Sequence, residues 1–347
     1  MLFDKTQRAK QCKSSRRYNP SALVKTKSLK ILVPTILLFL CSFFIAAYQV
    51  LACLATQGRD LTFFLAGDTH YDLSAKTVAY NRTIVDAMNS LPGTPYPPKT
   101  VTGTVNKPRG VAVLGDLVEE GEGEMGSKQW AEFTRDFGVC GEGRIDFPVY
   151  EGFGNHDGGA EHATRQGIKN RNTKRPALTH ISKNGFHYSW NWEGIHFIQL
   201  NLYPGTTADR IINPWGNYFE GSWKEPLHSL EFLRADLNKY AKDKAQPIII
   251  LMHYGFDENG LGWWSERERE AFYKTIKDNN ILAIFWGHTH MVQSIEWHGI
   301  PTFCVGSTQK SNGPGEFAVV NITDSTMYVM ERKLKYWGIV YKIEFSR

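Results

Sequence analysis

The stretch GFGNHDGG, residues 152–159, directly follows an apolar run and decides how the rest of the chain is read. It places an amide, an imidazole and a carboxylate (Asn155, His156 and Asp157) at the end of a predicted buried strand, between glycines that let the backbone turn sharply. Open α/β sheets hold their sites at the carboxyl ends of such strands. The stretch therefore predicts a functional site at a sheet edge.

Four other apolar runs end in the same way. They are LTFFLA (61–66), GVAVL (110–114), IIILM (248–252) and ILAIFW (281–286), and polar clusters beginning near residues 67, 115, 252 and 286 follow them. Each run reads as a buried strand. Alone, a Gly-Asp pair is usually a turn and a buried histidine is usually a core residue. Together, these strand ends collect Asp68, His70, Asp116, Asn155, His156, His253, His288 and His290.

The remaining patterns predict an α/β domain. Amphipathic stretches predict helices at 75–90, 127–137, 228–242 and 265–278. Residues 186–200 and 292–306 carry central turn signals, and 317–333 is rich in strand-forming residues, so all three predict antiparallel strands. No fixed-period repeat and no low-complexity linker follows residue 60. We therefore interpret residues 56–347 as one domain.

The side chains at the strand ends suit metal ions. Carboxylate, imidazole and amide donors together favour divalent ions such as Zn, Mn or Fe, and no thiolate accompanies them to indicate a structural zinc site. Cys140 and Cys304 are the only cysteines of the domain, and their pairing is left open.

The five polar blocks resemble the calcineurin-like metallophosphoesterase superfamily, and they stand in the order typical of that family between residues 67 and 290. The resemblance implies a four-layer αββα sandwich with two metal ions at the strand ends. It also implies a ligand set for each ion. One ion would be bound by Asp68, His70 and His290, the other by Asn155, His253 and His288, with Asp116 bridging both.

The activity implied by the resemblance is hydrolysis of a phosphate ester. Two ions, Mn, Fe or Zn, would produce a hydroxide nucleophile between them and neutralise charge on the phosphate. His156 would protonate the leaving alkoxide, and Asp157 would orient its imidazole. The blocks are most similar to the phosphodiesterase branch, so we expect a diester. An exported phosphomonoesterase is one alternative. A non-catalytic metal-bearing binding protein is another, although the intact ligand set argues against it.

Several residues near the blocks are given more ordinary roles. Glu119 is expected to be a solvated loop acid. For Arg165, Lys169 and Arg171, an exposed basic loop is favoured over contact with a substrate phosphate. For the aromatic segments Trp215 to Trp223 and Trp263-Trp264, core packing is favoured over a wall of the cleft that stacks on an apolar or planar leaving group.

The N-terminus predicts a membrane anchor. Residues 1–30 form a basic tail, and the 25 residues from Ile31 to Ala55 carry no charge, which is long enough to span a bilayer as a helix. The positive-inside rule then places the tail in the cytoplasm and the domain on the exported side. Cleavage near Ala55, which would release a secreted protein, is the alternative.

The charge distribution argues against a nucleic-acid partner. The whole chain has a formal net charge of +5, and the tail alone has +8 (nine basic residues and one acid), which leaves −3 for residues 31–347. A mildly acidic body has no electrostatic footprint for a phosphate backbone. The expected substrate is therefore a small-molecule or lipid-linked phosphate ester. Asn81 and Asn321 lie in glycosylation sequons, which would matter in a eukaryotic host.

Overall fold

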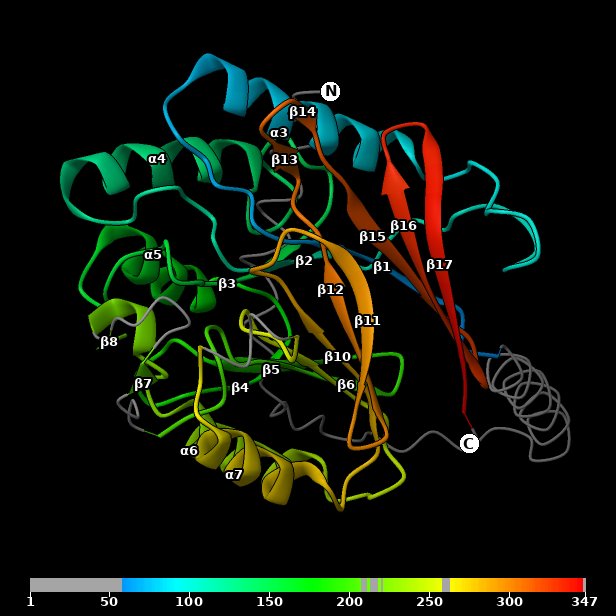
Figure 1. Cartoon of the computed structure of the whole chain (residues 1–347). Helices are drawn as coiled ribbons and strands as arrows, with labels where there is room; N and C mark the ends of the chain where they lie inside the picture. The colour runs from blue at the N-terminus through cyan, green and yellow to red at the C-terminus, as the bar shows by residue number, and fades with distance from the viewer. Residues whose placement is uncertain (1–57, 207–210, 213–217, 220, 258–262, 346–347) are drawn as a thin grey trace, which may run out of the picture.

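The computed structural model describes residues 58–206, 211–212, 218–219, 221–257 and 263–345. In this part of the chain two large mixed sheets lie face to face (Figure 1). The first has six strands in the order β17-β16-β15-β1-β2-β3, and the second has seven in the order β11-β12-β10-β9-β6-β5-β4.

The strands of the first sheet are β1 (Leu61–Ala66), β2 (Val111–Leu114), β3 (Val149–Gly152), β15 (Phe317–Ile322), β16 (Thr326–Lys333) and β17 (Tyr336–Glu344). Those of the second are β4 (Leu178–Ile181), β5 (Tyr188–Trp192), β6 (Ile195–Gln199), β9 (Ile248–Leu251), β10 (Ile281–Trp286), β11 (Val292–Trp297) and β12 (Ile300–Val305). Two small hairpins pair β7 (Ile211–Ile212) with β8 (Tyr218–Phe219), and β13 (Gln309–Lys310) with β14 (Gly313–Pro314).

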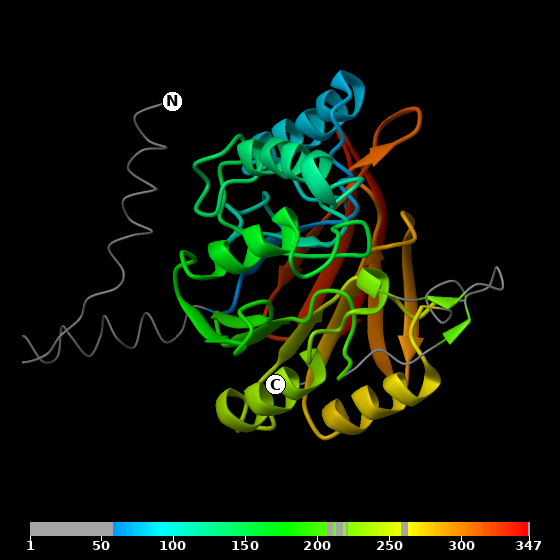
Figure 2. The same cartoon turned by 90° about the vertical axis from the view of Figure 1, so that its left-hand side faces the viewer.

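Helices cover the outer faces of the two sheets, as Figures 1 and 2 show from two directions. The helices α3 (Ala75–Ser90), α4 (Gly123–Asp136) and α5 (Ala163–Asn172) lie on the side of the first sheet. The helices α6 (Ser229–Tyr240) and α7 (Glu266–Ile276) lie on the side of the second, where a short 3-10 turn, η1 (Gly221–Lys224), precedes α6.

The alternation of side chains along the strands explains why the sheets pack between helices. In β1, Phe63 and Leu65 belong to the core between the sheets, whereas Phe64 packs in the core that the helices cover. In β9, Ile249 and Ile250 divide in the same way. Because both faces are buried, these strands are apolar throughout, as the sequence indicated.

The structure confirms the α/β class and the five predicted site strands. It also contains elements that the periodic patterns did not predict, among them β4, α5 and β17. The sequence patterns did not predict helix α5 because its buried face includes Arg165 and Arg171, so the helix lacks a regular apolar stripe. Strand β17 was not predicted because it lies at a sheet edge, where most of its residues are exposed or half-buried and it lacks an apolar run.

The structure addresses two further predictions, the N-terminal membrane segment and the pairing of the two cysteines, to different extents. The predicted tail and the membrane segment Ile31 to Ala55 lie outside the described residues. None of the helices in the described part of the chain has the length and apolar character needed to cross a bilayer. Cys304 is a free, buried thiol, so it does not pair with Cys140.

Both sequon asparagines are buried structural residues. The Asn81 amide donates to the Thr69 carbonyl at 2.7 Å and accepts from Thr308, and the Asn321 amide donates to Asp60 and Thr62. Because these contacts already occupy the two amides in the interior, neither side chain is available as a glycan acceptor in the folded domain.

Candidate metal centre

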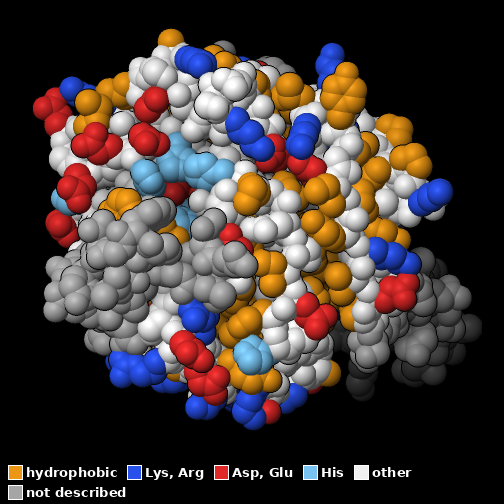
Figure 3. Space-filling model, in the orientation of Figure 1, with side chains coloured by type: hydrophobic (Ala, Val, Ile, Leu, Met, Phe, Trp, Pro, Cys, Tyr) orange, Lys and Arg blue, Asp and Glu red, His pale blue; other side chains and the backbone are white. Residues whose placement is uncertain are grey.

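Five loops from both sheets converge at one place on the domain. Asp68 and His70 follow β1, Asp116 follows β2 and Asn155 follows β3, all in the first sheet, while His253 follows β9 and His288 and His290 follow β10 in the second. The parallel pairs β1–β2, β2–β3 and β9–β10 bring these strand ends to the same edge of their sheets. In the space-filling view, histidine side chains gather there beside acidic side chains (Figure 3).

The backbone at the site is held in an unusual conformation. Asp68, His70, Asp116, His288 and His290 all have positive φ angles, of 49°, 40°, 49°, 74° and 58°. Residues other than glycine rarely adopt this region, and such strain persists where the surrounding structure imposes it, often at functional sites. The sharp turns let several donor atoms point inward from neighbouring loops.

Only glycine fits at two positions beside the ligands, because a Cβ atom there would collide with the ligand side chains. A Cβ on Gly154 would lie 2.2 Å from Oδ1 of Asp116 and 2.7 Å from Cε1 of His253. At Gly115, which has a φ of +89°, a Cβ would lie 2.5 Å from Nδ1 of His253. The glycines of the sequence blocks therefore allow the close approach of the donor side chains.

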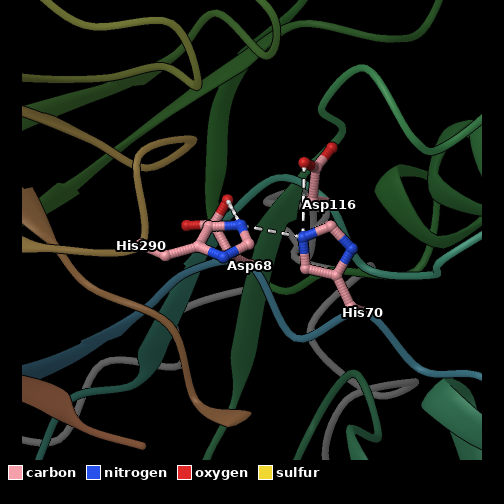
Figure 4. A group of neighbouring side chains, drawn as sticks. All are labelled: Asp68, His70, Asp116 and His290. Carbon is pink, nitrogen blue, oxygen red and sulfur yellow. Dashed lines mark hydrogen bonds and ion pairs between the residues drawn. The ribbon is translucent and has the colours of Figure 1, made fainter. Parts of the chain in front are cut away.

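The first set of donors, which we call the outer ligand group, contains Asp68, His70, Asp116 and His290 (Figure 4). The Nε2 atoms of His70 and His290 lie 3.0 Å apart. Nε2 of His70 is 3.6 Å from Oδ2 of Asp116, and Nε2 of His290 is 3.6 Å from Oδ1 of Asp68. Four potential ligand atoms thus face one another across a small space.

The second set, the inner ligand group, contains Asp116, Asn155, His253 and His288. Nε2 of His253 lies 3.0 Å from Oδ1 of Asn155 and 3.3 Å from Oδ2 of Asp116. Asp116, His253 and His288 each place a ligand atom within 4.8 Å of the others. Asp116 belongs to both groups, as a bridging carboxylate must.

Hydrogen bonds to the main chain orient the inner group. Nδ1 of His253 donates to the Leu114 carbonyl at 2.8 Å, which leaves Nε2 as the atom that faces Asp116. Such a second bond fixes the tautomer and the orientation of a metal-binding imidazole. The backbone N–H of His288 donates to Oδ1 of Asp68 at 2.8 Å and so links the loops after β10 and β1.

The chemistry of the two groups fits metal ions. Oδ2 of Asp68 is buried, and no hydrogen-bond donor of the described residues reaches it, which is costly for a polar atom unless a cation satisfies it. Burial raises the pKa of Asp68. Burial also opposes ionisation of Asp116, but His253, His156 and His70 hold its pKa well below the usual range. An ionised bridging carboxylate is what two cations would need.

His156 lies beside the outer group without being one of its members. Its Nδ1 donates to the Glu119 carbonyl at 2.7 Å, its backbone N–H donates to Oδ1 of Asp116 at 2.9 Å, and its ring centroid is 4.7 Å from that of His70. The Nδ1 bond leaves Nε2 as the ring atom that can exchange a proton with a bound molecule.

Asp157 has a different environment from the one expected. Its Oδ1 accepts from the N–H groups of Leu117 and Val118 at 2.9 and 3.1 Å, and its Oδ2 accepts from Gly154 at 2.7 Å. The Glu119 carbonyl, rather than this carboxylate, contacts the His156 ring. Asp157 is fully buried, and its burial together with the nearby Asp116 raises its pKa to about 7. It therefore joins the second and third site loops instead of orienting the imidazole.

Glu119 is a site residue that the sequence interpretation missed. Its Oε2 lies 2.8 Å from Nδ1 of His70, so this carboxylate stands behind a metal-binding imidazole. Contact with His70 lowers the pKa of Glu119. Burial alone would lower the pKa of His70, but Glu119, Asp116 and Asp68 raise it to about 9. The position of Glu119 in the same polar block as Asp116 was the available signal.

The predicted exposed basic loop is instead part of helix α5, and its arginines are buried. Arg165 binds Oε2 of Glu225 at 2.9 Å, and Arg171 binds Oε1 of Glu151 at 2.8 Å. Because these charges are already paired inside the domain, neither arginine forms a surface for substrate phosphate.

Comparison with solved structures identifies proteins of similar fold. Among solved structures, it is similar to a dimetal phosphatase from Danio rerio, with 13% identity, a TM-score of 0.57 and coverage of 82% of this chain and 99% of that chain. It is also similar to Plasmodium GAP50, the anchor in the inner membrane complex (13%, TM-score 0.47, 83% and 89% coverage), and to TT1561 of Thermus thermophilus (13%, 0.44, 82% and 99%).

The search of curated protein sequences gives no match. The family model described as calcineurin-like phosphoesterase matches residues 61–292, which contain all the loops of the metal centre. The chain therefore belongs to the calcineurin-like phosphoesterase family of phosphoric ester hydrolases.

Proposed function

We propose that this protein hydrolyses a phosphodiester at a centre of two divalent metal ions. The observation that carries the proposal is the position of Asp116, which is shared by two groups of ligand atoms and accepts a hydrogen bond from the backbone of His156. In this arrangement His156 would be a proton donor directly beside a two-metal centre.

The residues have separate tasks in the proposed reaction. Asp68, His70 and His290 would hold one ion, Asn155, His253 and His288 the other, and Asp116 both. When bound, the two ions activate water and neutralise charge on the transferred phosphoryl group. His156 holds a proton at Nε2 and transfers it to the leaving oxygen, while its Nδ1 bond to the Glu119 carbonyl keeps the ring oriented.

The charge around the centre favours a diester over a monoester. A phosphodiester carries one negative charge, whereas a monoester carries nearly two at neutral pH. Within the described residues, the ion-pair partners of Asp68, Asp116 and Glu119 are all histidines. Lys224 and Arg165, the cations of the adjoining segments, are buried against Glu268 and Glu225. Metal ions would therefore supply most of the positive charge, which suits the less charged substrate.

A substrate comparison tests the proposal. The domain from residue 56, loaded with Mn, is expected to show a higher kcat/KM for bis-p-nitrophenyl phosphate than for p-nitrophenyl phosphate. A higher value for the monoester would identify the chain as a phosphomonoesterase. Two bound ions with no turnover of either ester would identify a metal-bearing binding protein and overturn the proposal.

We also propose that residues 31–55 anchor the domain to a membrane, with the basic tail cytoplasmic and the catalytic domain exported. The support is the uncharged 25-residue segment behind nine basic residues. The intact chain should require detergent for extraction, and protease added on the exported side should leave the N-terminus intact. A soluble mature protein that begins near Thr56 would show that the segment is a cleaved signal.

A further inference from the structure

Three aromatic side chains form a stack that extends from His288 of the inner ligand group to His156. We call Trp223, Tyr254 and Trp263 the aromatic wall. Trp263 stacks on Trp223, with ring centroids 5.9 Å apart at 26°, and on Tyr254, at 5.4 Å and 28°. The edge of the wall meets the metal centre, because the Trp263 ring lies 4.4 Å from that of His288.

The members of the wall differ in exposure. Tyr254 and Trp263 are buried, with 0% and 5% of their surfaces accessible, whereas Trp223 is 38% exposed. The ring of Trp223 lies 5.8 Å from that of His156, tilted by 37°. Trp264, the sequence neighbour of Trp263, points away into the core and donates its indole N–H to Gly255. The wall therefore offers one accessible indole, and that indole lies next to the proposed proton donor.

The backbone around Trp223 is fixed from two directions. The Tyr254 hydroxyl donates to the Trp223 carbonyl at 2.7 Å. The buried guanidinium of Arg165 donates to the Ser222 carbonyl at 2.7 Å and to Glu225 at 2.9 Å. Residues on both sides of Trp223 are thus tied to helix α5. An aromatic surface that is ordered before binding loses little conformational entropy when a ligand stacks on it.

We infer that Trp223 selects phosphate esters whose leaving group carries a planar ring, such as an aryl group or a nucleobase. The inference rests on the proposed function, because it follows from the task of His156. The imidazole protonates the leaving oxygen, so the side chain beside it meets the leaving group rather than the group that remains on phosphorus. An indole face favours planar rings over saturated ones of similar size.

Two diesters of matched chemistry test the inference. Methyl 2-phenylethyl phosphate and methyl 2-cyclohexylethyl phosphate release alcohols of nearly equal acidity and similar apolar area, and only the first has a planar ring. Beyond the apolar area that both rings bury, an aromatic pair typically contributes about 2- to 13-fold. We expect kcat/KM for release of 2-phenylethanol to exceed that for the cyclohexyl alcohol by a factor within this range.

Substitutions at Trp223 test whether this residue causes the preference for the phenyl ester. Trp223→Ala should bring the ratio of the two kcat/KM values close to one, while Trp223→Phe should retain much of it. Tyr336→Ala, which removes an aromatic ring that is 77% exposed on β17, is the matched control and should leave the ratio unchanged. Inhibition by phosphonates in which a methylene replaces the leaving-group oxygen gives a second readout, and it should show the same preference for the phenyl compound.

The outcomes separate this inference from the proposed function. If neither diester is hydrolysed and neither phosphonate inhibits, the proposed function fails. If both are hydrolysed at equal rates, or if Trp223→Ala keeps the phenyl preference, the role of Trp223 is overturned while the proposed function stands. The methyl esters of adenosine 5′-phosphate and ribose 5-phosphate identify the source of the ring. A gain for adenosine points to nucleosides, and a gain limited to phenyl points to smaller aryl groups.

Discussion

The outer and inner ligand groups share a carboxylate but are built on different supports. In the outer group His290 is 44% exposed, and His70 is backed by the carboxylate of Glu119, which is itself 52% exposed. In the inner group His253 is fully buried and is backed by the main-chain carbonyl of Leu114. Within the described residues, the rings of Tyr254 and Trp263 contact His253 and His288 of the inner group, and no Trp, Tyr or Phe ring contacts the outer group.

This difference separates two ways of orienting an imidazole. A main-chain carbonyl inside the sheet cannot be altered by substitution of its side chain and is shielded from solvent. An exposed carboxylate can be removed, titrated or screened by salt. We therefore expect the outer ion to exchange more readily and to respond to second-layer substitutions, and the inner ion to persist.

The largest expected effect comes from the residue that the groups share. Asp116→Asn removes a bridging charge from both, so metal content should fall at both positions. The loss of activity should exceed the roughly 10- to 100-fold typical of removing an outer partner of a ligand. Metal analysis and kcat/KM on the same preparations check this. Asp278→Asn, at an exposed acid, is the control, and retention of two tightly bound ions by Asp116→Asn would contradict the bridging role.

The next effect separates chemistry from metal binding. His156 contacts the outer group through its ring and Asp116 through its backbone, so His156→Ala should leave both ions in place. General acid catalysis typically contributes about 10² to 10⁴-fold. The variant should lose roughly that factor on alkyl esters and much less on p-nitrophenyl esters, whose leaving group needs no proton. Equal losses on both kinds of ester, or lost metal, would argue for a different role.

Glu119→Gln probes the support of the outer group alone. It keeps the shape of the side chain but removes the charge behind His70, so affinity at the outer position should fall by about 10- to 100-fold. The inner ion should remain. Competition titration with a chromogenic chelator can resolve the two steps. Glu120→Gln, at the exposed neighbour, is the matched control and should titrate like the parent protein.

The smallest expected effect is the release of protons from His70 and His253 when metal binds. Without metal, nearby carboxylates raise the pKa values of His70 and His253 to about 9 in spite of burial. Both imidazoles are then protonated at pH 7 and must release a proton to bind metal. Metal affinity should therefore rise with pH up to about 9. Calorimetry in buffers of different ionisation enthalpy should detect proton release at pH 7 that falls as the pH rises past about 9, because the two imidazoles are then already neutral before metal binds.

The same calorimetric titration distinguishes the Glu119 carboxylate behind His70 from the Leu114 carbonyl behind His253. Glu119→Gln should reduce proton release in the outer step, because it removes one cause of the raised pKa of His70. The inner step should be unchanged. Equal changes in both steps would mean that the two groups do not act as separate units.

The sequence predicted the site strands well because both physical signals were local. Each buried strand is a short apolar run, and each is followed at once by glycine and polar residues, so position in the chain implied position at a sheet edge. Helix α5 was hidden because its inward face uses Arg165 and Arg171, whose partners Glu225 and Glu151 are distant in sequence. A search for apolar periodicity cannot detect a helix that is buried through ion pairs.

The detailed roles in the site were less predictable. Whether the carboxylate after His156 contacts that ring or three N–H groups depends on χ angles and on loops from other strands. In the same way, Glu119 was interpreted as a solvated acid because carboxylates in loops usually face water, and only the fold brings His70 against it. Motifs indicate which residues meet, while the partner of each atom is decided by tertiary packing.

The direction of β1 has a consequence for the reach of the enzyme. The chain enters the domain at Leu61 and runs through six residues to Ala66, which at about 3.3 Å per residue spans roughly 20 Å, before the first ligand, Asp68. The catalytic edge is thus at the far end of the strand from the point where a tether through residues 31–55 would join. If β1 lay perpendicular to the membrane in a tethered domain, the catalytic edge would be well above the lipid headgroups. The substrate would then reach the site from the surrounding solution.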